Sequence, residues 1–428
     1  NTSNSIMIRS EYISRNLSDL EKLVKGLTPL LNEGGVMTLN GQIGAGKTTL
    51  AKLIIHDLTQ VPLEEIVSPT FNLYHTYNKD NLEIMHYDLY RIESEIELLE
   101  IDLNEALTDK ICIIEWADKF KDLLPKDRIE ITIKCTKNER LYKINPLGKF
   151  KDVIKNWAKI ENFLSDLDIN FTELQRLRGD ASKRKYYRVK SLDNTMILMD
   201  ATQESDMKSK TGPTDGINDF IKIQEYLDSI DVRVPKLIVR NKLDNIILEE
   251  DLGEYSYTDM LTKENYVELY NPAIKTLIHI SKINHPKNIS TNSNPHYLKE
   301  FDLDTYLNEA EIFIDYYWPF IHGKQCNADK KKEFRNIMAG VYSNLTNDKT
   351  LMLRDFHSPN LLFLENENGF RKCAINDFQD ALFGHPLYDL VSLTNDARIT
   401  IDEYQEKYLI ELYKKDFPFN NFQFDSLS

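Results

Sequence analysis

Cysteine is scarce in this sequence, and long apolar runs are absent. The 428 residues include four cysteines, which are Cys112, Cys135, Cys326 and Cys373. They form no CxxC pair and have no spacing typical of metal ligands, so the sequence predicts neither a disulfide framework nor a cysteine metal centre. Scattered single cysteines are typical of proteins from a reducing cytosol. We therefore expect a cytoplasmic protein.

No stretch of eighteen apolar residues occurs, and the first residues lack the basic and then apolar pattern of a signal peptide. We expect neither a membrane span nor secretion. An excess of basic residues is also lacking: 53 Lys and Arg face 68 Asp and Glu, and the formal net charge is −15. Because a broad nucleic-acid interface needs a basic face, any link to RNA is expected to run through a partner protein.

Length and composition indicate two globular domains. A chain of 428 residues, with 41% hydrophobic residues, 22 Tyr and 19 Phe, is too long for one ordinary domain and apolar enough for two cores. In "NPLGK" at 145–149, Pro146 and Gly148 interrupt the periodic pattern on both sides. We therefore predict domains at 1–147 and 148–428.

The first domain reads as a small α/β fold. Ser18 and Glu21 have capping-box spacing and precede apolar residues at helical spacing, which predicts a helix over 18–31. "VMTLN" predicts a buried strand, and "KTTLAKLIIHDL" predicts the next helix. Further strands are predicted at "LYHTY", "LEIMHYDLY" and "ICIIEWA", with "RIEITIKC" and "RLYKIN" as edge strands.

Between the first strand and the second helix lies "GQIGAGKTTL" at 41–50, which matches GxxxxGK[ST]. Glycines let backbone N–H groups approach phosphates, a lysine meets the β- and γ-phosphates, and a threonine hydroxyl ligates Mg²⁺. The order of strand, loop and helix is the context that such a loop requires. We therefore expect ATP and Mg²⁺ here. The predicted nucleotide-binding residues are Gly41, Gly44, Ala45, Gly46, Lys47, Thr48 and Thr49.

Two carboxylates follow strand patterns in the same domain. Asp88 ends "LEIMHYD" and Glu115 ends "ICIIE", which places both where an α/β sheet presents ligands at its carboxyl edge. Either residue is able to hold Mg²⁺ through water or to orient an attacking water. The alternative is that both are solvated loop carboxylates.

Three further motifs follow the loop in order: "VSPTF", "HYDLYR" and "IIEWAD". With the loop they resemble the TsaE family of ATPases over residues 7–145, a family that acts in bacterial synthesis of N6-threonylcarbamoyladenosine at position 37 of tRNA. The resemblance implies that Asp88 activates water, that Glu115 binds Mg²⁺ with Thr48, and that Thr70 lies in a switch-like loop near the γ-phosphate. It also implies TsaB-like and TsaD-like partners, with tRNA contacted only indirectly.

The residues next to these motif residues have either a functional role or a packing role. His86, Tyr90 and Trp116 each flank a motif residue, and packing is the alternative for each. Because the "EW" region faces partner proteins in the family, the resemblance favours an interface role for Trp116. Gln42 stands where the family loop commonly carries Asp, which changes no phosphate ligand.

The second domain begins with a predicted helix at "VIKNWAKIENFL", followed by two predicted strands at "GDASKRKYYRV" and "TMILMDA". From about residue 260 onward the pattern is mainly helical, with a strand-rich insert around "RDFHSPN".

This domain carries a different phosphotransfer pattern. "RDFHSPN" places Asp355 and Asn360 five positions apart, and "INDFQD" places Asp377 22 residues after Asp355. Kinase chemistry needs one carboxylate to accept the proton of the substrate hydroxyl. It also needs an amide and a second carboxylate to hold Mg²⁺ on the phosphates. The spacing fits that arrangement.

With "RLRGDASKRKYYRV", "EEDLG" and "FQDALFGHPLYDLVSLTNDAR", this pattern resembles the aminoglycoside phosphotransferase and choline kinase-like superfamily over about residues 150–400. It is most similar to the anomeric sugar kinases of cell-wall recycling, which phosphorylate the 1-hydroxyl of N-acetylmuramic acid and N-acetylglucosamine. The resemblance implies a bilobal α+β fold, with a small lobe at about 148–255 and a helical lobe at about 256–428.

By the same resemblance, Asp355 is the catalytic base, Asn360 and Asp377 are Mg²⁺ ligands, and "EEDLG" is a hinge that contacts adenine through its backbone. The loop over the ATP phosphates is implied at Gly179–Lys185. Its predicted nucleotide contacts are Gly179, Asp180, Ala181, Ser182 and Lys183.

Other polar residues near these motifs are less specific. Asp380 is expected either to help bind the metal or to cap a helix N-terminus. Asp389 is expected to have a structural role. For His357 and His385, substrate contact and a structural role both remain open.

Two features depart from the superfamily pattern. Met199 stands where many relatives place a lysine on the α- and β-phosphates, so Lys183, Arg184 or Lys185 is left to supply that charge. The chain stops at "NNFQFDSLS", where the family usually continues with further helices, so we expect a helical lobe that is truncated at the C-terminus.

The sequence thus predicts a bifunctional fusion: an ATPase for tRNA threonylcarbamoylation and an amino-sugar kinase. One alternative is that the first module is a nucleotide-gated regulatory binder. The other is that the second module phosphorylates an aminoglycoside, choline or a similar small hydroxyl compound.

Overall fold

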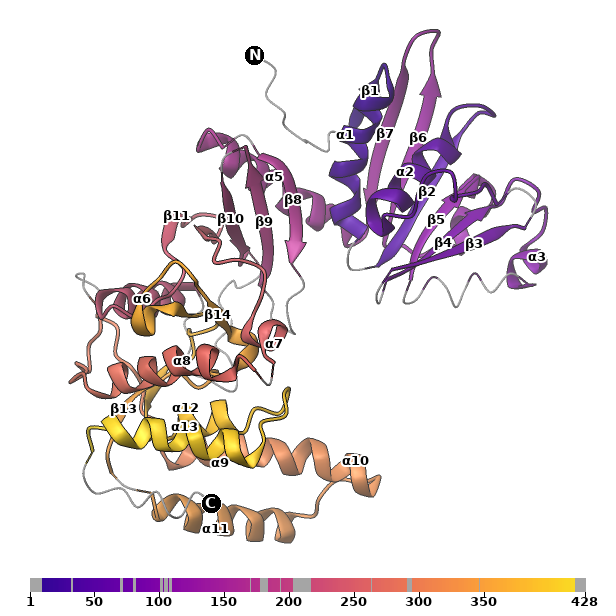
Figure 1. Cartoon of the computed structure of the whole chain (residues 1–428). Helices are drawn as coiled ribbons and strands as arrows, with labels where there is room; N and C mark the ends of the chain where they lie inside the picture. The colour runs from indigo at the N-terminus through magenta and orange to yellow at the C-terminus, as the bar shows by residue number, and fades with distance from the viewer. Residues whose placement is uncertain are drawn as a thin grey trace. The chain divides into compact units, whose positions relative to one another are not determined.

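The computed structural model describes residues 10–31, 34–69, 72–79, 82–100, 103, 107, 110–169, 171–177, 184–192, 194–202, 217–262, 264–290, 295–345 and 347–419. The chain divides into two compact units, residues 1–202 with 241–246 and residues 203–240 with 247–428. Figure 1 shows the chain and labels most of the helices and strands described below. The domain boundary inferred from "NPLGK" stays a prediction.

A seven-stranded sheet organises the first part of the chain. Its strands are β1 (Glu11–Ser14), β2 (Gly35–Gly41), β3 (Tyr74–Lys79), β4 (Leu82–Asp88), β5 (Ile111–Glu115), β6 (Arg128–Cys135) and β7 (Arg140–Leu147). Their order in the sheet is β1-β7-β6-β2-β5-β4-β3. β2 is parallel to β5 and β6, and β4 is parallel to β5. The predicted α/β fold is confirmed.

The prediction of two edge strands was wrong. β6 lies between β7 and β2, and β7 lies between β1 and β6, so the sheet edges are β1 and β3. The sequence "EYIS" of β1 is short, with only its last residue buried, and therefore has no clear strand pattern. Its antiparallel pairing with β7 protects an edge that would otherwise expose unpaired backbone groups.

Helices pack on both faces of this sheet (Figure 1). On one face, α1 (Leu17–Leu27) and α2 (Lys47–Thr59) share an apolar core with β2, β5 and β6. On the other, α3 (Glu95–Glu100) and η2 (Ala117–Leu123) contribute to a second core. The predicted capping box of the first helix was wrong, because Asn16 is the N-cap and its side chain accepts from Asp19 N at 2.9 Å.

The next segment contains α5 (Phe150–Asp166) and a sheet of order β11-β12-β10-β9-β8. The predicted helix is confirmed as α5, and the two predicted strands are confirmed as β9 and β10. β8 was not predicted, and its pairing with β9 has a register shift between Phe171 and Glu173. The elements are β8 (Phe171–Leu177), β9 (Lys185–Ser191), β10 (Thr195–Asp200), α6 (Ile217–Ser229), β11 (Leu237–Asn241) and β12 (Ile246–Glu250).

The rest of the chain is mainly helical, as predicted, with strands inserted around the "RDFHSPN" motif (Figure 1). The helices are α7 (Tyr257–Met260), α8 (Tyr266–Ser281), α9 (Leu303–Ile312), η3 (Phe313–Tyr317), α10 (Trp318–His322), α11 (Ala328–Ser343), η4 (Ser358–Asn360), η5 (Gly369–Lys372), α12 (Tyr388–Thr394) and α13 (Glu403–Asp416). Strand β13 (Thr350–Met352) pairs with β16 (Leu382–Gly384), and β14 (Leu361–Phe363) pairs with β15 (Cys373–Ile375). Across the described ranges, no helix has the length and apolar character needed to cross a membrane.

A buried carboxyl group on α5 gives a testable prediction about stability. Glu161 is 4% exposed, and burial raises its pKa to about 7 from an ordinary value of 4.5. Between these two pH values the folded protein keeps a proton that the unfolded chain has lost, so the free energy of unfolding falls from pH 4.5 to pH 7 and levels off above pH 7. We expect Glu161→Gln to increase the free energy of unfolding by about 3 kcal/mol at pH 8.

Denaturant unfolding at pH 4.5 and pH 8 measures this effect. At pH 4.5 the Gln variant and the natural chain should be nearly equally stable, because both carry a neutral side chain in the folded state. Asp166→Asn, an exposed position of the same helix, is the matched control. A Glu161→Gln effect of equal size at both pH values would contradict the prediction.

Candidate active sites

The phosphate-binding loop joins β2 to α2 with a geometry that glycine permits. Gly41 has φ 149°, and a Cβ atom there would lie 2.6 Å from the Ile133 carbonyl oxygen. Gly46 has φ 99° and is the N-cap of α2 without any side-chain cap. The first N–H groups of a 13-residue helix therefore remain available to an anion, as a phosphate site requires.

Lys47 points onto its own loop. Its Nζ donates to Gly41 O at 2.8 Å and to Gln42 O at 2.9 Å, and it lies 3.5 Å from the centroid of the Trp116 ring. Burial lowers the pKa of Lys47, although the carboxylates of Glu115 and Asp88 oppose that shift. Phosphate oxygens would therefore have to replace the two carbonyl oxygens as acceptors.

Glu115 links the loop helix to the middle of the sheet. Its Oε2 accepts from Thr48 Oγ1 at 2.9 Å, and its Oε1 lies 2.9 Å from His86 Nε2. Glu115 is 1% exposed and Asp88 is 6% exposed, so neither is a solvated loop carboxylate. Asp88 is the register partner of Glu115 at the ends of β4 and β5, and its Oδ1 accepts from Tyr90 N at 2.9 Å.

The other predicted contacts of this loop have varied positions. Ala45 is buried and its carbonyl oxygen accepts from Arg140 Nε at 3.0 Å, whereas Thr49 is exposed in the first turn of α2. Gly44 has φ 76° and nothing within 4 Å of an added Cβ. Thr70 lies outside the described residues.

In the second domain, the structure brings Asp355, Asn360 and Asp377 together. Asn360 Nδ2 donates to Asp355 O at 3.1 Å and lies 3.5 Å from Asp377 Oδ2. Asp377 has φ 57° and also contacts the Gln379 amide. Burial, followed by the nearby Asp377 carboxylate, raises the pKa of Asp355.

Buried carboxylates accept hydrogen bonds from the backbone of the loop that carries Asp355. Asp389 accepts from Leu353 N at 2.7 Å and from Arg354 N at 2.9 Å, and burial raises its pKa to about 7. Asp396 accepts from Ser358 N at 2.9 Å. Asp389 therefore supports the backbone before Asp355, as its expected structural role requires. Sequence reasoning missed Asp396, although it belongs to the quoted "NDAR" motif.

Glu309 is a second residue that sequence reasoning missed. Its carboxylate forms an ion pair with Arg354, the residue directly before Asp355. Burial raises the pKa of Glu309, which lies on α9 more than forty residues earlier in the chain. No motif surrounds it, so only the folded chain reveals its contact with Arg354 beside Asp355.

The remaining predicted residues are less informative. Gly179, Asp180, Ala181, Ser182 and Lys183 lie outside the described residues. Arg184 is buried, Lys185 is half-buried and Met199 is buried, so the cation for the α- and β-phosphates stays unassigned. His357 Nε2 lies 3.8 Å from Asp355 Oδ1, whereas His385 Nδ1 accepts from Leu387 N at 3.3 Å.

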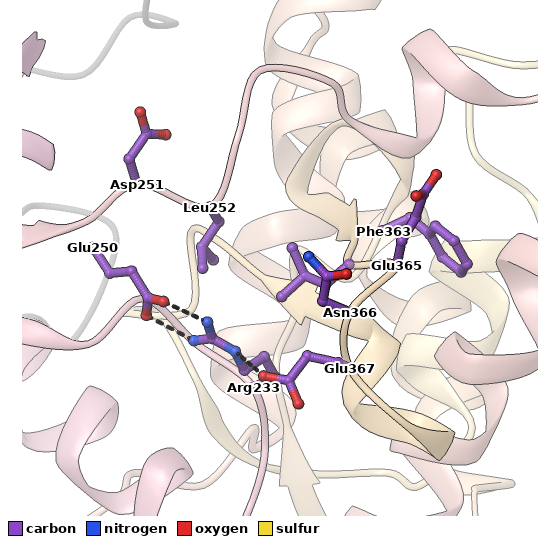
Figure 2. Close-up of a pocket in the computed structure, with 9 residues that line it drawn as sticks. Arg233, Glu250, Asp251, Leu252, Phe363, Glu365, Asn366 and Glu367 are labelled. Atoms are coloured by element: carbon purple, nitrogen blue, oxygen red, sulfur yellow. Dashed lines mark hydrogen bonds and ion pairs between the residues drawn. The ribbon is translucent and has the colours of Figure 1, made fainter. Parts of the chain in front are cut away.

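The predicted hinge lies beside a cavity of about 290 Å³. Figure 2 shows Arg233 between Glu250 of the hinge and Glu367 of the loop after β14. Arg233 donates twice to the Glu250 carboxylate, at 2.9 and 2.6 Å, and its Nε donates to Glu367 at 3.0 Å. Asp251 Oδ1 accepts from Gly253 N at 3.0 Å. The side chains of Glu250 and Asp251 are thus engaged within the protein.

Comparison with known proteins gives two matches in different parts of the chain. The family model described as threonylcarbamoyl adenosine biosynthesis protein TsaE matches residues 14–142. A tRNA threonylcarbamoyladenosine biosynthesis protein TsaE from Rickettsia felis is 39% identical over 158 residues, which are 37% of this chain and 92% of that protein.

The model described as phosphotransferase enzyme family matches residues 173–419. An N-acetylmuramate/N-acetylglucosamine kinase from Pseudomonas aeruginosa is 28% identical over 232 residues, which are 54% of this chain and 62% of that protein. A protein of the same name from Caulobacter vibrioides is 26% identical over 274 residues, which are 59% of this chain and 74% of that protein.

The contact between Lys47 and Trp116 predicts an optical signal for nucleotide binding. Phosphates that draw Lys47 Nζ from the carbonyl oxygens also draw it from the indole ring and remove a cation–π contact. We expect ATP to change the tryptophan emission of the full chain. Trp116→Phe and Lys47→Ala should each abolish that change, whereas an unaltered response in Trp116→Phe would contradict this account.

Proposed function

Because the chain belongs to the TsaE family through residues 14–142 and to the phosphotransferase enzyme family through residues 173–419, we propose that it carries two separate ATP-using activities. The first is an ATPase that supports formation of N6-threonylcarbamoyladenosine at position 37 of tRNA. The second transfers phosphate from ATP to the anomeric hydroxyl of N-acetylmuramate or N-acetylglucosamine. We place both in the cytoplasm, in keeping with four free cysteines.

The observation that carries the first activity is the contact between Thr48 and Glu115, directly after Lys47 at the start of α2. Lys47 would meet the β- and γ-phosphates once it leaves the loop carbonyl oxygens. The Thr48 hydroxyl and the Glu115 carboxylate offer adjacent oxygen ligands, which suit Mg²⁺. When bound, Mg²⁺ neutralises charge on the phosphate oxygens. Asp88 at the same sheet edge would orient the attacking water.

This ATPase is proposed to work with TsaB-like and TsaD-like partners and to reach tRNA only through them. The resting position of Lys47 favours turnover that depends on partners, because loop carbonyl oxygens and Trp116 occupy the side chain that must bind phosphate. A net charge of −15 also suits indirect rather than direct contact with tRNA.

The observation that carries the second activity is the convergence of Asp355, Asn360 and Asp377. The Asp355 carboxylate would accept the proton of the sugar hydroxyl as its oxygen forms a bond to the γ-phosphorus and the bond to ADP breaks. A raised pKa makes Asp355 a stronger base than an ordinary aspartate. Asn360 and Asp377 would hold Mg²⁺ against the phosphates.

Two substitutions should separate the activities. We expect Lys47→Ala to reduce partner-dependent ATP hydrolysis by about 10²-fold or more and to leave sugar phosphorylation intact. Asp355→Ala should reduce sugar phosphorylation by about 10²- to 10⁴-fold and leave hydrolysis intact. The assays are phosphate release with the partner proteins and product analysis with N-acetylmuramate, which locates the new phosphate.

Asp329→Ala is the matched control for Asp355→Ala, because Asp329 is an exposed aspartate of α11 in the same lobe, and it should retain both activities. Loss of both activities by either single change at Lys47 or Asp355 would contradict the two-site proposal. A phosphate on a hydroxyl other than the anomeric one would contradict the proposed sugar chemistry.

A further inference from the structure

His86 is a fully buried residue that contacts Glu115. It meets the carboxylate oxygen that does not contact Thr48. The side chains of His86 and Glu115 are 0% and 2% exposed. His86 belongs to β4 and Glu115 ends β5, which is the neighbouring parallel strand. Because Glu115 Oε1 faces His86 and Oε2 faces Thr48, one carboxylate joins the sheet to the first turn of α2.

The chemistry of the two groups fixes the direction of the hydrogen bond. An ionised carboxylate only accepts hydrogen bonds. His86 Nε2 must therefore carry the ring proton and donate a hydrogen bond to Glu115. The other ring nitrogen, Nδ1, is buried with no hydrogen-bond partner within the described part of the chain. Buried polar atoms are usually paired, and the contact with Glu115 is the single hydrogen bond that His86 makes among the described residues.

His75 is the nearest comparable residue. It is the register partner of His86 on β3, and it is half-buried. The structure gives it no contact with Glu115 among the described hydrogen bonds and ion pairs. The two histidines therefore lie opposite each other on neighbouring strands, but only His86 contacts the Glu115 carboxylate among the described hydrogen bonds and ion pairs.

We infer that His86 is a positioning residue for the first ATP site, and this inference rests on the proposed ATPase function. Its Nε2–H fixes Glu115 so that the second carboxylate oxygen stays beside the Thr48 hydroxyl, which keeps both Mg²⁺ ligands in place before the nucleotide arrives. Donors behind a ligand carboxylate orient it and tune metal affinity in the same way. His86 acts through Glu115 and touches neither phosphate nor metal.

The test measures how Mg²⁺ strengthens binding of a non-hydrolysable ATP analogue to the full chain. Every protein carries Asp377→Ala, so that the second site adds no Mg²⁺-dependent signal, and Lys47→Ala in that background is the blank. His86→Leu removes the donor, whereas His86→Gln keeps an N–H at similar reach. We expect His86→Leu to raise the Mg²⁺ concentration for half-maximal effect about tenfold and His86→Gln to stay within about threefold of the parent.

The analogue affinity in EDTA should be unchanged in both variants, because the loop itself is intact. His75→Leu is the matched control and should behave as the parent. If His86→Leu does not fold, His86→Asn takes its place, since its amide is too short to reach Glu115. The inference would be overturned if His86→Leu (or His86→Asn) needed the same Mg²⁺ concentration as the parent. It would also be overturned if that variant and His86→Gln raised the Mg²⁺ concentration equally. A parent with no Lys47-dependent binding would instead overturn the proposed ATP site.

Discussion

Burying a carboxylate costs free energy unless hydrogen-bond donors surround it, and Glu115 meets this constraint with His86 on one side and Thr48 on the other. The strand ends of β4 and β5, the start of α2 and the phosphate-binding loop all meet at this group. Lys47 lies in the same buried region and takes loop carbonyl oxygens and the Trp116 ring as partners. The Glu115 contacts are thus in place without a ligand, whereas Lys47 has to leave its partners before it can meet a phosphate.

In the second candidate site, buried carboxylates are also surrounded by hydrogen-bond donors, although the fold is different. Asp389 and Asp396 are buried and accept backbone N–H groups from the segment that carries Asp355 and Asn360. These bonds support a turn in which Arg354 has φ 69°. The same turn carries Asp355 and Asn360, and Asn360 Nδ2 lies 3.5 Å from Asp377 Oδ2. Buried carboxylates therefore position the reactive groups in both domains.

Contiguous motifs made much of this predictable from the sequence. The glycines and Lys47 lie within one short loop, and Asp355 and Asn360 lie within another, so local spacing reveals them. Contacts between distant segments were not predictable: Glu309 meets Arg354 across 45 positions. The edge strands were misassigned for a similar reason, since only pairing with the short β1 places β7 inside the sheet.

We propose that one chain holds two independent ATP sites. Isothermal titration of the full chain with a non-hydrolysable ATP analogue in Mg²⁺ measures their number directly. Two sites predict two molar equivalents of the analogue per chain, and one equivalent when Lys47 is replaced by alanine. Binding of a single equivalent to the natural chain would contradict it.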